Sequence, residues 1–260
     1  MSESEQFIFG HKQSTGRKNI QKRLREISAD PMTPLVRILQ PKADPLLSDD
    51  ISAYRHAYQN YYLSMARFLP EMSLARRYSD GPGAVRKSGG KYTESERRIA
   101  VKFRPVAPFL EFDLLNCVIH CRILMDRVAG LADRFLVSEK SRPSFSSFSD
   151  HKKFFQKLKA PYGHHEEYAE YIRSSTAWFD MPLKHVRDNY VMHLSPKHMR
   201  FLGSSGSGPV LELNIIVAKG GKDKPLSPVK MVTVSPFQMS YEVQEFLTWF
   251  AAYGAKALSS

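Results

Sequence analysis

The strongest constraint on the fold of this chain is a seam of apolar residues that recurs at alternating steps of four and three residues. This spacing places all members on one face of an α-helix, as in helices that pack side by side in a bundle. The sequence therefore predicts a long central helix from about Val106 to Val137. The seam consists of Leu110, Leu114, Cys117, Cys121, Leu124, Val128, Leu131 and Phe135.

Further helices are expected on both sides of this seam. One runs from about Ser48 to Leu69, where an N-capping cluster begins it and Pro70 helps to end it. Another runs from about Ser240 to Leu258, with Val243, Phe246, Leu247, Phe250 and Gly254 on one face. Shorter helices are expected at about Asp150–Lys159, His164–Phe179 and Pro182–Leu194.

Two β-branched segments precede the last helix, Val210–Val217 and Val229–Val234, and a glycine-containing connection joins them. Partial alternation and the glycines favour a β-hairpin. The predicted fold class is therefore mainly α. We expect an antiparallel bundle of about four main helices over residues 48–258, with a hairpin at about 210–234 inserted before the last helix.

Two regions are expected to lack regular structure. Residues 1–47 contain four prolines and a run of basic residues. This pattern predicts a weakly structured, basic N-terminal arm, which either contacts phosphates or packs on the outside of the domain. Residues 79–93 are glycine-rich and basic, and they read as a loop. The glycine spacing fits neither a P-loop nor a dinucleotide fingerprint.

The charge balance points to polyanionic partners. Lys and Arg outnumber Asp and Glu by 38 to 26, a formal net charge of +12, which favours RNA and DNA over membrane surfaces. Two cysteines indicate a reducing, cytoplasmic location. The acidic N-terminus does not resemble a signal peptide. No apolar stretch approaches the ~20 residues that span a bilayer, so no membrane contact is expected.

Clusters that suggest metal ligands have simpler explanations. Cys117 and Cys121 lie within the apolar seam, which favours buried thiols over a metal site. His164 and His165, followed by Glu166 and Glu167, indicate a solvated helix start, because adjacent residues on a helix point apart. Tyr54, Tyr58, Tyr61 and Tyr62 have the helical spacing of core or interface residues, which disfavours a base-stacking platform. No metal or cofactor is expected.

One short stretch carries the functional prediction, Arg187-Asp-Asn-Tyr-Val-Met-His193. An arginine followed directly by Asp188, with His193 six positions on, resembles the motif of the HEPN superfamily (higher eukaryotes and prokaryotes nucleotide-binding). The resemblance implies a helical, metal-independent endoribonuclease that acts as a homodimer and leaves a 2′,3′-cyclic phosphate. It also implies a role in toxin–antitoxin or antiphage systems, with an antitoxin as a possible protein partner.

The residue types suit this chemistry. A histidine that titrates near neutrality can act as general acid or base, and a permanently charged arginine can hold phosphate as negative charge develops. On a straight helix Arg187 and His193 lie about 120° apart and ~9 Å along the axis. Either a frayed helix or a symmetric pair of chains must bring such residues together, and we predict an isologous homodimer.

Neighbouring residues and alternative interpretations complete the prediction. Lys184, Asn189, His198 and Arg200 are candidate RNA contacts, although chance adjacency would also explain them. His193 falls in step with apolar neighbours and is equally explained as a core histidine. The alternative function is a non-catalytic helical module that binds RNA or a protein partner.

Overall fold

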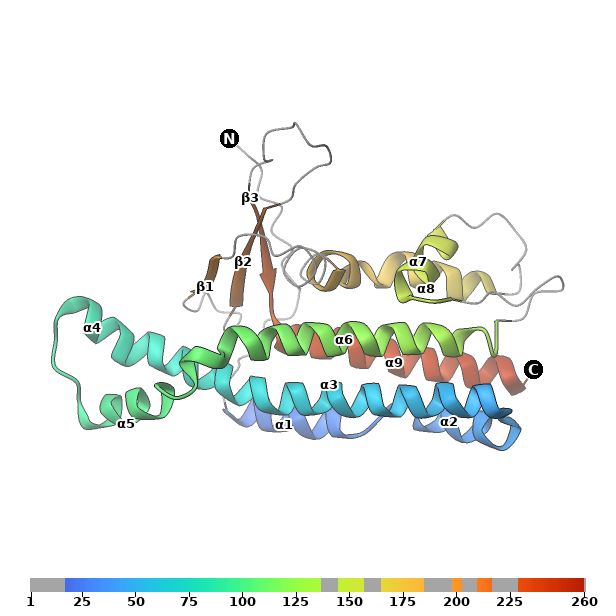
Figure 1. Ribbon diagram of the computed structural model, residues 1–260, viewed down its shortest axis with the longest axis horizontal. Helices are drawn as coiled ribbons and strands as arrows, with labels where there is room; N and C mark the ends of the chain where they lie inside the picture. Colours follow the sequence, from blue (N-terminus) through green and yellow to red (C-terminus); the bar gives the residue numbers. More distant parts are fainter. Residues whose placement is uncertain are drawn as a thin grey trace. The chain divides into compact units, whose positions relative to one another are not determined.

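The computed structural model describes residues 17–136, 145–156, 165–184, 198–202, 210–216 and 229–259. The chain is mainly helical, as the sequence predicts (Figure 1). The helices are α1 (Arg17–Ser28), α2 (Thr33–Leu39), α3 (Pro45–Tyr78), α4 (Ala84–Ser88), α5 (Glu94–Phe103), α6 (Leu110–Ala132), α7 (Phe148–Gln156), α8 (Glu166–Ser175) and α9 (Pro236–Ser259). Short turns of helix are η1 (Gln40–Lys42), η2 (Ser79–Gly83), η3 (Ala107–Phe109) and η5 (Phe179–Lys184).

The strands are β1 (His198–Leu202), β2 (Val210–Ile216) and β3 (Val229–Val234). They pair antiparallel in the order β1-β2-β3. In the register, Arg200 pairs with Glu212, and Leu213 pairs with Val232.

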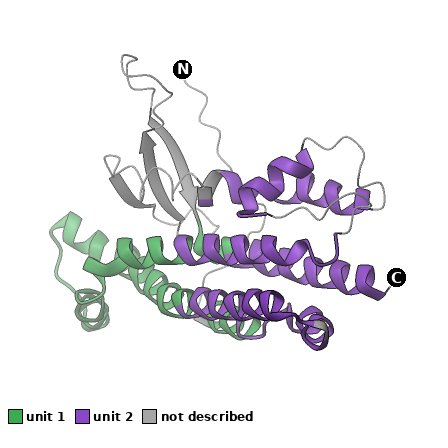
Figure 2. Cartoon of the chain, turned by 45° about the vertical axis from the view of Figure 1, so that its right-hand side comes forward, with its two compact units in different colours: residues 1–26, 64–118, 185–239 green, residues 27–63, 119–184, 240–260 purple. Residues whose placement is uncertain are grey.

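The chain divides into two compact units (Figure 2). Unit 1 comprises residues 1–26, 64–118 and 185–239, and unit 2 comprises residues 27–63, 119–184 and 240–260. The unit boundaries after residues 63 and 118 fall inside α3 and α6, so each of these helices contributes to both units.

The apolar stripes predicted from periodicity are buried. Every member of the seam, from Leu110 to Phe135, is at most 3% exposed. The predicted stripe of α3 is likewise buried from Ile51 to Phe68, and so is that of α9 from Val243 to Phe250. Cys117 and Cys121 are free, fully buried thiols, and burial raises the pKa of Cys121 far above its usual range. The interpretation of both cysteines as core residues is confirmed.

Aromatic side chains fill the interior of unit 2. Phe135 packs edge-on against Phe250 with ring centroids 5.1 Å apart, and Phe148 packs edge-on against Phe246 at 5.2 Å. Offset-stacked and edge-to-face pairs of this kind contribute beyond the area they bury. α9 therefore contacts both α7 and the chain that follows α6.

The expectation of a weakly structured arm is wrong for residues 17–42, which form α1, α2 and η1. The prolines start helices there, because Pro34 and Pro41 occupy first-turn positions and Pro45 opens α3. A proline in the first turn loses no helical hydrogen bond. Apolar side chains at Met32, Leu35, Val36 and Leu39 are buried and hold this region in place.

Several helix boundaries also differ from the prediction. α3 starts at Pro45, so the N-capping cluster expected at Ser48 lies inside the helix. α3 continues through Pro70 to Tyr78, because burial of Leu69 and Met72 on the continuing apolar stripe offsets the helical hydrogen bond that Pro70 cannot donate. The central helix α6 starts at Leu110, preceded by the 3₁₀ turn η3 that contains Pro108.

The loop expected at residues 79–93 is partly helical. η2 and α4 occupy residues 79–88, and Gly89 ends α4 in the left-handed conformation at φ 73°. Helix α5 was not predicted from the sequence, and it starts with a capping box between Thr93 and Glu96. Such a box satisfies amide groups at a helix N-terminus that otherwise lack partners.

Candidate functional site

The proposed catalytic residues fall outside the part of the chain that the structure describes. Arg187, Asp188, Asn189 and His193 lie between η5 and β1. Their mutual geometry therefore stays a prediction. Lys184 is the last residue of η5, and His198 and Arg200 are in β1, but the described side chains do not include theirs.

The segment that leads into the motif is held by a buried lysine. Lys152 on α7 is 3% exposed, and its Nζ donates to the carbonyl of Thr176 and to Oδ2 of Asp180, each at 2.6 Å. Asp180 lies in η5, seven positions before Arg187. Lys152 therefore ties α7 to the end of α8 and to η5.

A buried arginine lies beside the same turn. The Arg122 guanidinium stands 4.3 Å from the centroid of the Phe179 ring, and it also contacts Oδ2 of Asp126 at 3.2 Å and Oγ of Ser149 at 3.3 Å. The cation over an aromatic face and the paired carboxylate both stabilise the buried charge. Because Asp126 and Asp180 balance Arg122 and Lys152, this cluster supports the η5 turn and does not present an anion site.

His151 of α7 is a core histidine. It is fully buried, and its Nε2 lies 2.9 Å from the hydroxyl of Tyr168. Phe148 and Phe155 flank its ring. Burial lowers the pKa of His151 to about 3, so the imidazole is neutral near physiological pH. A histidine without access to solvent cannot exchange protons with a substrate, and we exclude His151 as a catalytic group.

The predicted helix start is confirmed, since α8 begins at Glu166, but the prediction that His165 is solvated is wrong. His165 is 8% exposed, and its Nδ1 lies 2.7 Å from the hydroxyl of Tyr253 on α9. The partner is far away in the sequence, so local pattern could not reveal it. Glu166 and Glu167, which follow His165, are exposed. No group of three or more metal-ligating side chains occurs among the described residues.

Unit 1 contains a close pair of carboxyl groups that the sequence reading missed. The Arg67 Nε contacts Asp113 Oδ1 at 3.0 Å and Glu71 Oε1 at 3.7 Å. The pKa of Glu71 is raised to about 7, first by burial and then by the hydrogen bond and the charge of Asp113, while Arg67 acts in the opposite direction. Two adjacent carboxyl groups share one proton in this way, because both cannot ionise at close range.

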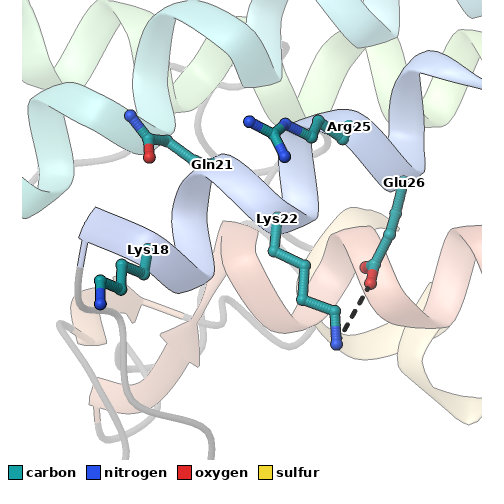
Figure 3. Close-up of a pocket in the computed structure, with 5 residues that line it drawn as sticks. All are labelled: Lys18, Gln21, Lys22, Arg25 and Glu26. Atoms are coloured by element: carbon teal, nitrogen blue, oxygen red, sulfur yellow. Dashed lines mark ion pairs between the residues drawn. The ribbon is translucent and has the colours of Figure 1, made fainter.

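Basic side chains gather on the exposed face of α1 in unit 1. Lys18, Gln21, Lys22, Arg25 and Glu26 line a shallow depression (Figure 3). Lys22 and Glu26 form an ion pair at 3.8 Å. Since all lining residues come from one helix, the depression supplies surface charge but no enclosed site.

A second basic segment covers residues 84–104, which we call the α4–α5 segment. It contains seven Lys or Arg residues and two Glu residues, a net charge of +5 out of +12 for the whole chain. This basic segment could have been predicted from the run Arg-Arg-Ile-Ala-Val-Lys-Phe-Arg at residues 97–104, in which four of eight residues are basic. In the part of the chain that the structure describes, no helix has the length and apolar character of a membrane span.

Comparisons with protein-family models, with curated proteins and with solved structures found no match to this chain. The resemblance to HEPN proteins therefore rests on residues 187–193 and on the helical, basic character of the chain.

Proposed function

We propose that this protein is a metal-independent endoribonuclease of the HEPN kind. The observation that carries the proposal is the stretch Arg187-Asp188-x-x-x-x-His193 in a mainly helical, strongly basic chain. The fold that accompanies the proposal is an antiparallel helical bundle with a β-hairpin before the last helix.

The roles of the residues follow from their chemistry. His193 exchanges protons with the reacting oxygens, and Arg187 binds the phosphate and stabilises the charge that develops on it. Asp188 orients the site. Attack of the 2′-oxygen on the adjacent phosphorus breaks the bond to the 5′-oxygen, which takes up a proton. The product ends are a 2′,3′-cyclic phosphate and a 5′-hydroxyl.

A symmetric homodimer supplies the geometry that one straight helix cannot. Residues six positions apart diverge by about 120° around a helix. A two-fold interface repeats the same patch on both chains, so Arg187 of one protomer can approach His193 of its partner. Lys184, Asn189, His198 and Arg200 would hold the RNA near this site. An antitoxin or another protein partner would regulate it.

The alternative is a helical module that binds RNA without cleaving it. The exposed cations of α1 and of the α4–α5 segment favour this second candidate, because phosphate binding needs no titrating histidine. Binding by Lys and Arg changes little between about pH 6 and 8, whereas histidine-dependent cleavage changes over that range.

The test is cleavage of several single-stranded RNAs in excess EDTA, with identification of the product ends. We expect wild-type protein to cleave and to leave cyclic phosphate ends, and we expect His193→Ala to bind RNA without cleaving it. Absence of cleavage by folded wild-type protein on all RNAs would favour the binding module. Cleavage that EDTA abolishes would contradict a metal-independent mechanism.

A further inference from the structure

The α4–α5 segment presents an unusual concentration of unneutralised positive charge. Both of its acids are engaged within α5, because Glu94 pairs with Arg98 and Glu96 accepts hydrogen bonds from the Thr93 amide and hydroxyl. The other cations form no ion pair with any residue that the structure describes. They are Arg86, Lys87, Lys91, Arg97, Lys102 and Arg104, and all are exposed.

The packing of α5 directs this charge outward. The ring of Phe103 stacks on that of Tyr78, with centroids 4.3 Å apart, and this contact fixes the inner face of the helix. Ile99, Ala100 and Phe103 are half-buried. Arg97 lies one turn from Val101, which is 72% exposed. Residues four apart share one side of a helix, so the outer face carries Arg97, Arg98 and Lys102 around a single apolar residue.

Two exposed aromatic side chains follow directly. Phe109 ends η3 and is 51% exposed, and Phe112 in the first turn of α6 is 59% exposed. A single exposed apolar residue is ordinary, but exposed apolar side chains that lie close together mark interaction sites. Positions three apart are neighbours on a helical surface. Cations followed by exposed aromatic rings are the features that bind single strands, since phosphates pair with the cations and unstacked bases pack on the rings.

We propose that Arg97, Lys102 and Arg104, together with Phe109 and Phe112, form a binding site for single-stranded RNA in unit 1 that includes no residue of the Arg187–His193 motif. The identity of the ligand as RNA rests on the proposed function. Cations of the site contact the phosphates without reading sequence, and the two rings stack on bases. A duplex fits less well, because its bases are not available for stacking.

An anionic membrane surface is the main competitor for a basic face. A helix that lies in a membrane interface needs a broad apolar face to insert between the headgroups. The outer face of α5 has only Val101 in this role, and the other large apolar side chains of α5 face inward. The charge and apolar pattern therefore favours RNA.

The test measures binding of a fluorescent, uridine-rich single-stranded RNA whose 2′-oxygens are all methylated. Such RNA cannot be cleaved by 2′-OH attack, so wild-type protein can be used and binding is read independently of catalysis. Fluorescence anisotropy over a range of salt concentrations gives the dissociation constant and its salt dependence. The same titrations are made on two triple variants and on one double variant.

The first variant is Arg97→Gln/Lys102→Gln/Arg104→Gln, and its matched control is Arg37→Gln/Arg127→Gln/Lys153→Gln. The control removes the same charge from exposed positions in unit 2. We expect the first variant to bind roughly tenfold or more weakly, with a salt slope shallower by about 2, because each lost phosphate contact removes about 0.7 from the slope on single strands. The control should bind within about twofold of wild type.

The double variant Phe109→Ser/Phe112→Ser tests stacking. It should weaken binding at least about fivefold without changing the salt slope, because stacking releases no counterions. Both residues are exposed, so far-UV circular dichroism should match wild type.

Equal affinities of the α5 variant and its control would overturn the proposal, even if wild type cleaves RNA and the proposed function stands. Failure of wild type to bind the methylated RNA would overturn it as well, and the EDTA cleavage assay would then decide the proposed function separately. Loss of binding to phosphatidylserine vesicles in the α5 variant, with RNA affinity unchanged, would assign the surface to membranes.

Discussion

Gly254 of α9 occupies a position where the structure leaves no room for a side chain. A Cβ at this residue would lie 2.9 and 3.0 Å from the Cδ atoms of Leu35 and 3.0 Å from Cε1 of Phe135. Leu35 is fully buried, and Phe135 is held edge-on against Phe250. Neither side chain can move away freely. We therefore expect the side chain of Gly254→Ala to impose a steric cost on unit 2.

Gly130 of α6 provides the matched control, because a Cβ there would meet nothing within 4 Å. Both glycines are inside helices of unit 2, so both substitutions gain the same helix propensity of about 1 kcal/mol. Gly130→Ala should stabilise by about 0.5–1 kcal/mol. Gly254→Ala adds the cost of overpacking, about 1–3 kcal/mol, and should be neutral or destabilising by up to ~2 kcal/mol. The difference between the variants isolates the steric cost.

Tryptophan fluorescence during urea unfolding is the appropriate assay. The two tryptophans of the chain, Trp178 and Trp249, both belong to unit 2, so their emission reports on the unit that contains both substitutions. We expect the free energy of unfolding of Gly254→Ala to fall at least about 1 kcal/mol below that of Gly130→Ala. Equal stability of the two variants, or a more stable Gly254→Ala protein, would refute the packing described around Leu35 and Phe135.

Three further predictions concern charged groups. Asp180→Ala should destabilise unit 2 by about 3 kcal/mol, because it leaves the buried Lys152 ammonium without its carboxylate. Lys152→Met should destabilise it by less, because water reaches the Asp180 carboxylate that is left behind. Urea titration followed by tryptophan emission should give this order. Burial holds the pKa of His151 near 3 in the folded protein, whereas the unfolded value is ~6.5, so below pH 6.5 the unfolded chain binds one more proton than the folded chain. As the pH falls from 6.5 towards 3, the free energy of unfolding of wild type should therefore fall relative to that of His151→Gln by up to about 1.4 kcal/mol per pH unit. Parallel pH profiles of the two proteins would contradict this. Burial and Asp113 raise the pKa of Glu71 to about 7, so between about pH 4.5 and 7 the folded chain binds one more proton than the unfolded chain. The stabilisation from this proton is lost as the pH rises through 7, so Glu71→Gln should gain stability relative to wild type from pH 5 to pH 8. Thermal unfolding of both proteins, followed by circular dichroism, measures this difference.

Periodicity predicted the buried helical faces because burial of a helix follows its own repeat. The positions from Leu110 to Phe135 show this, as do those from Ile51 to Phe68, and all are buried. Boundaries were less predictable. α3 continues through Pro70 because burial of Leu69 and Met72 offsets the hydrogen bond that the proline cannot donate. Pro34 and Pro41 start helices where the proline content suggested an arm. The capping box at Thr93 and Glu96 was a local signal for α5 that the glycines before it obscured.

Side chains whose partners are distant in the sequence could not be predicted. His165 is buried because Tyr253 contacts it, and Lys152 is buried because Thr176 and Asp180 accept its hydrogen bonds. Nothing in the local pattern identifies such partners. The catalytic prediction, in contrast, depends on no distant partner, since Arg187 and His193 were identified from their spacing in the sequence. Both residues lie outside the described residues.

The most direct test of the account is a mixing experiment with two inactive variants. Arg187→Ala and His193→Ala proteins are assayed for RNA cleavage in excess EDTA, separately and after subunit exchange at equal concentrations. If the site combines Arg187 of one protomer with His193 of its partner, half of the dimers are mixed and each has one intact site of two. We expect no cleavage by either variant alone and recovery of about a quarter of wild-type activity in the mixture. Full cleavage by either variant alone would contradict it.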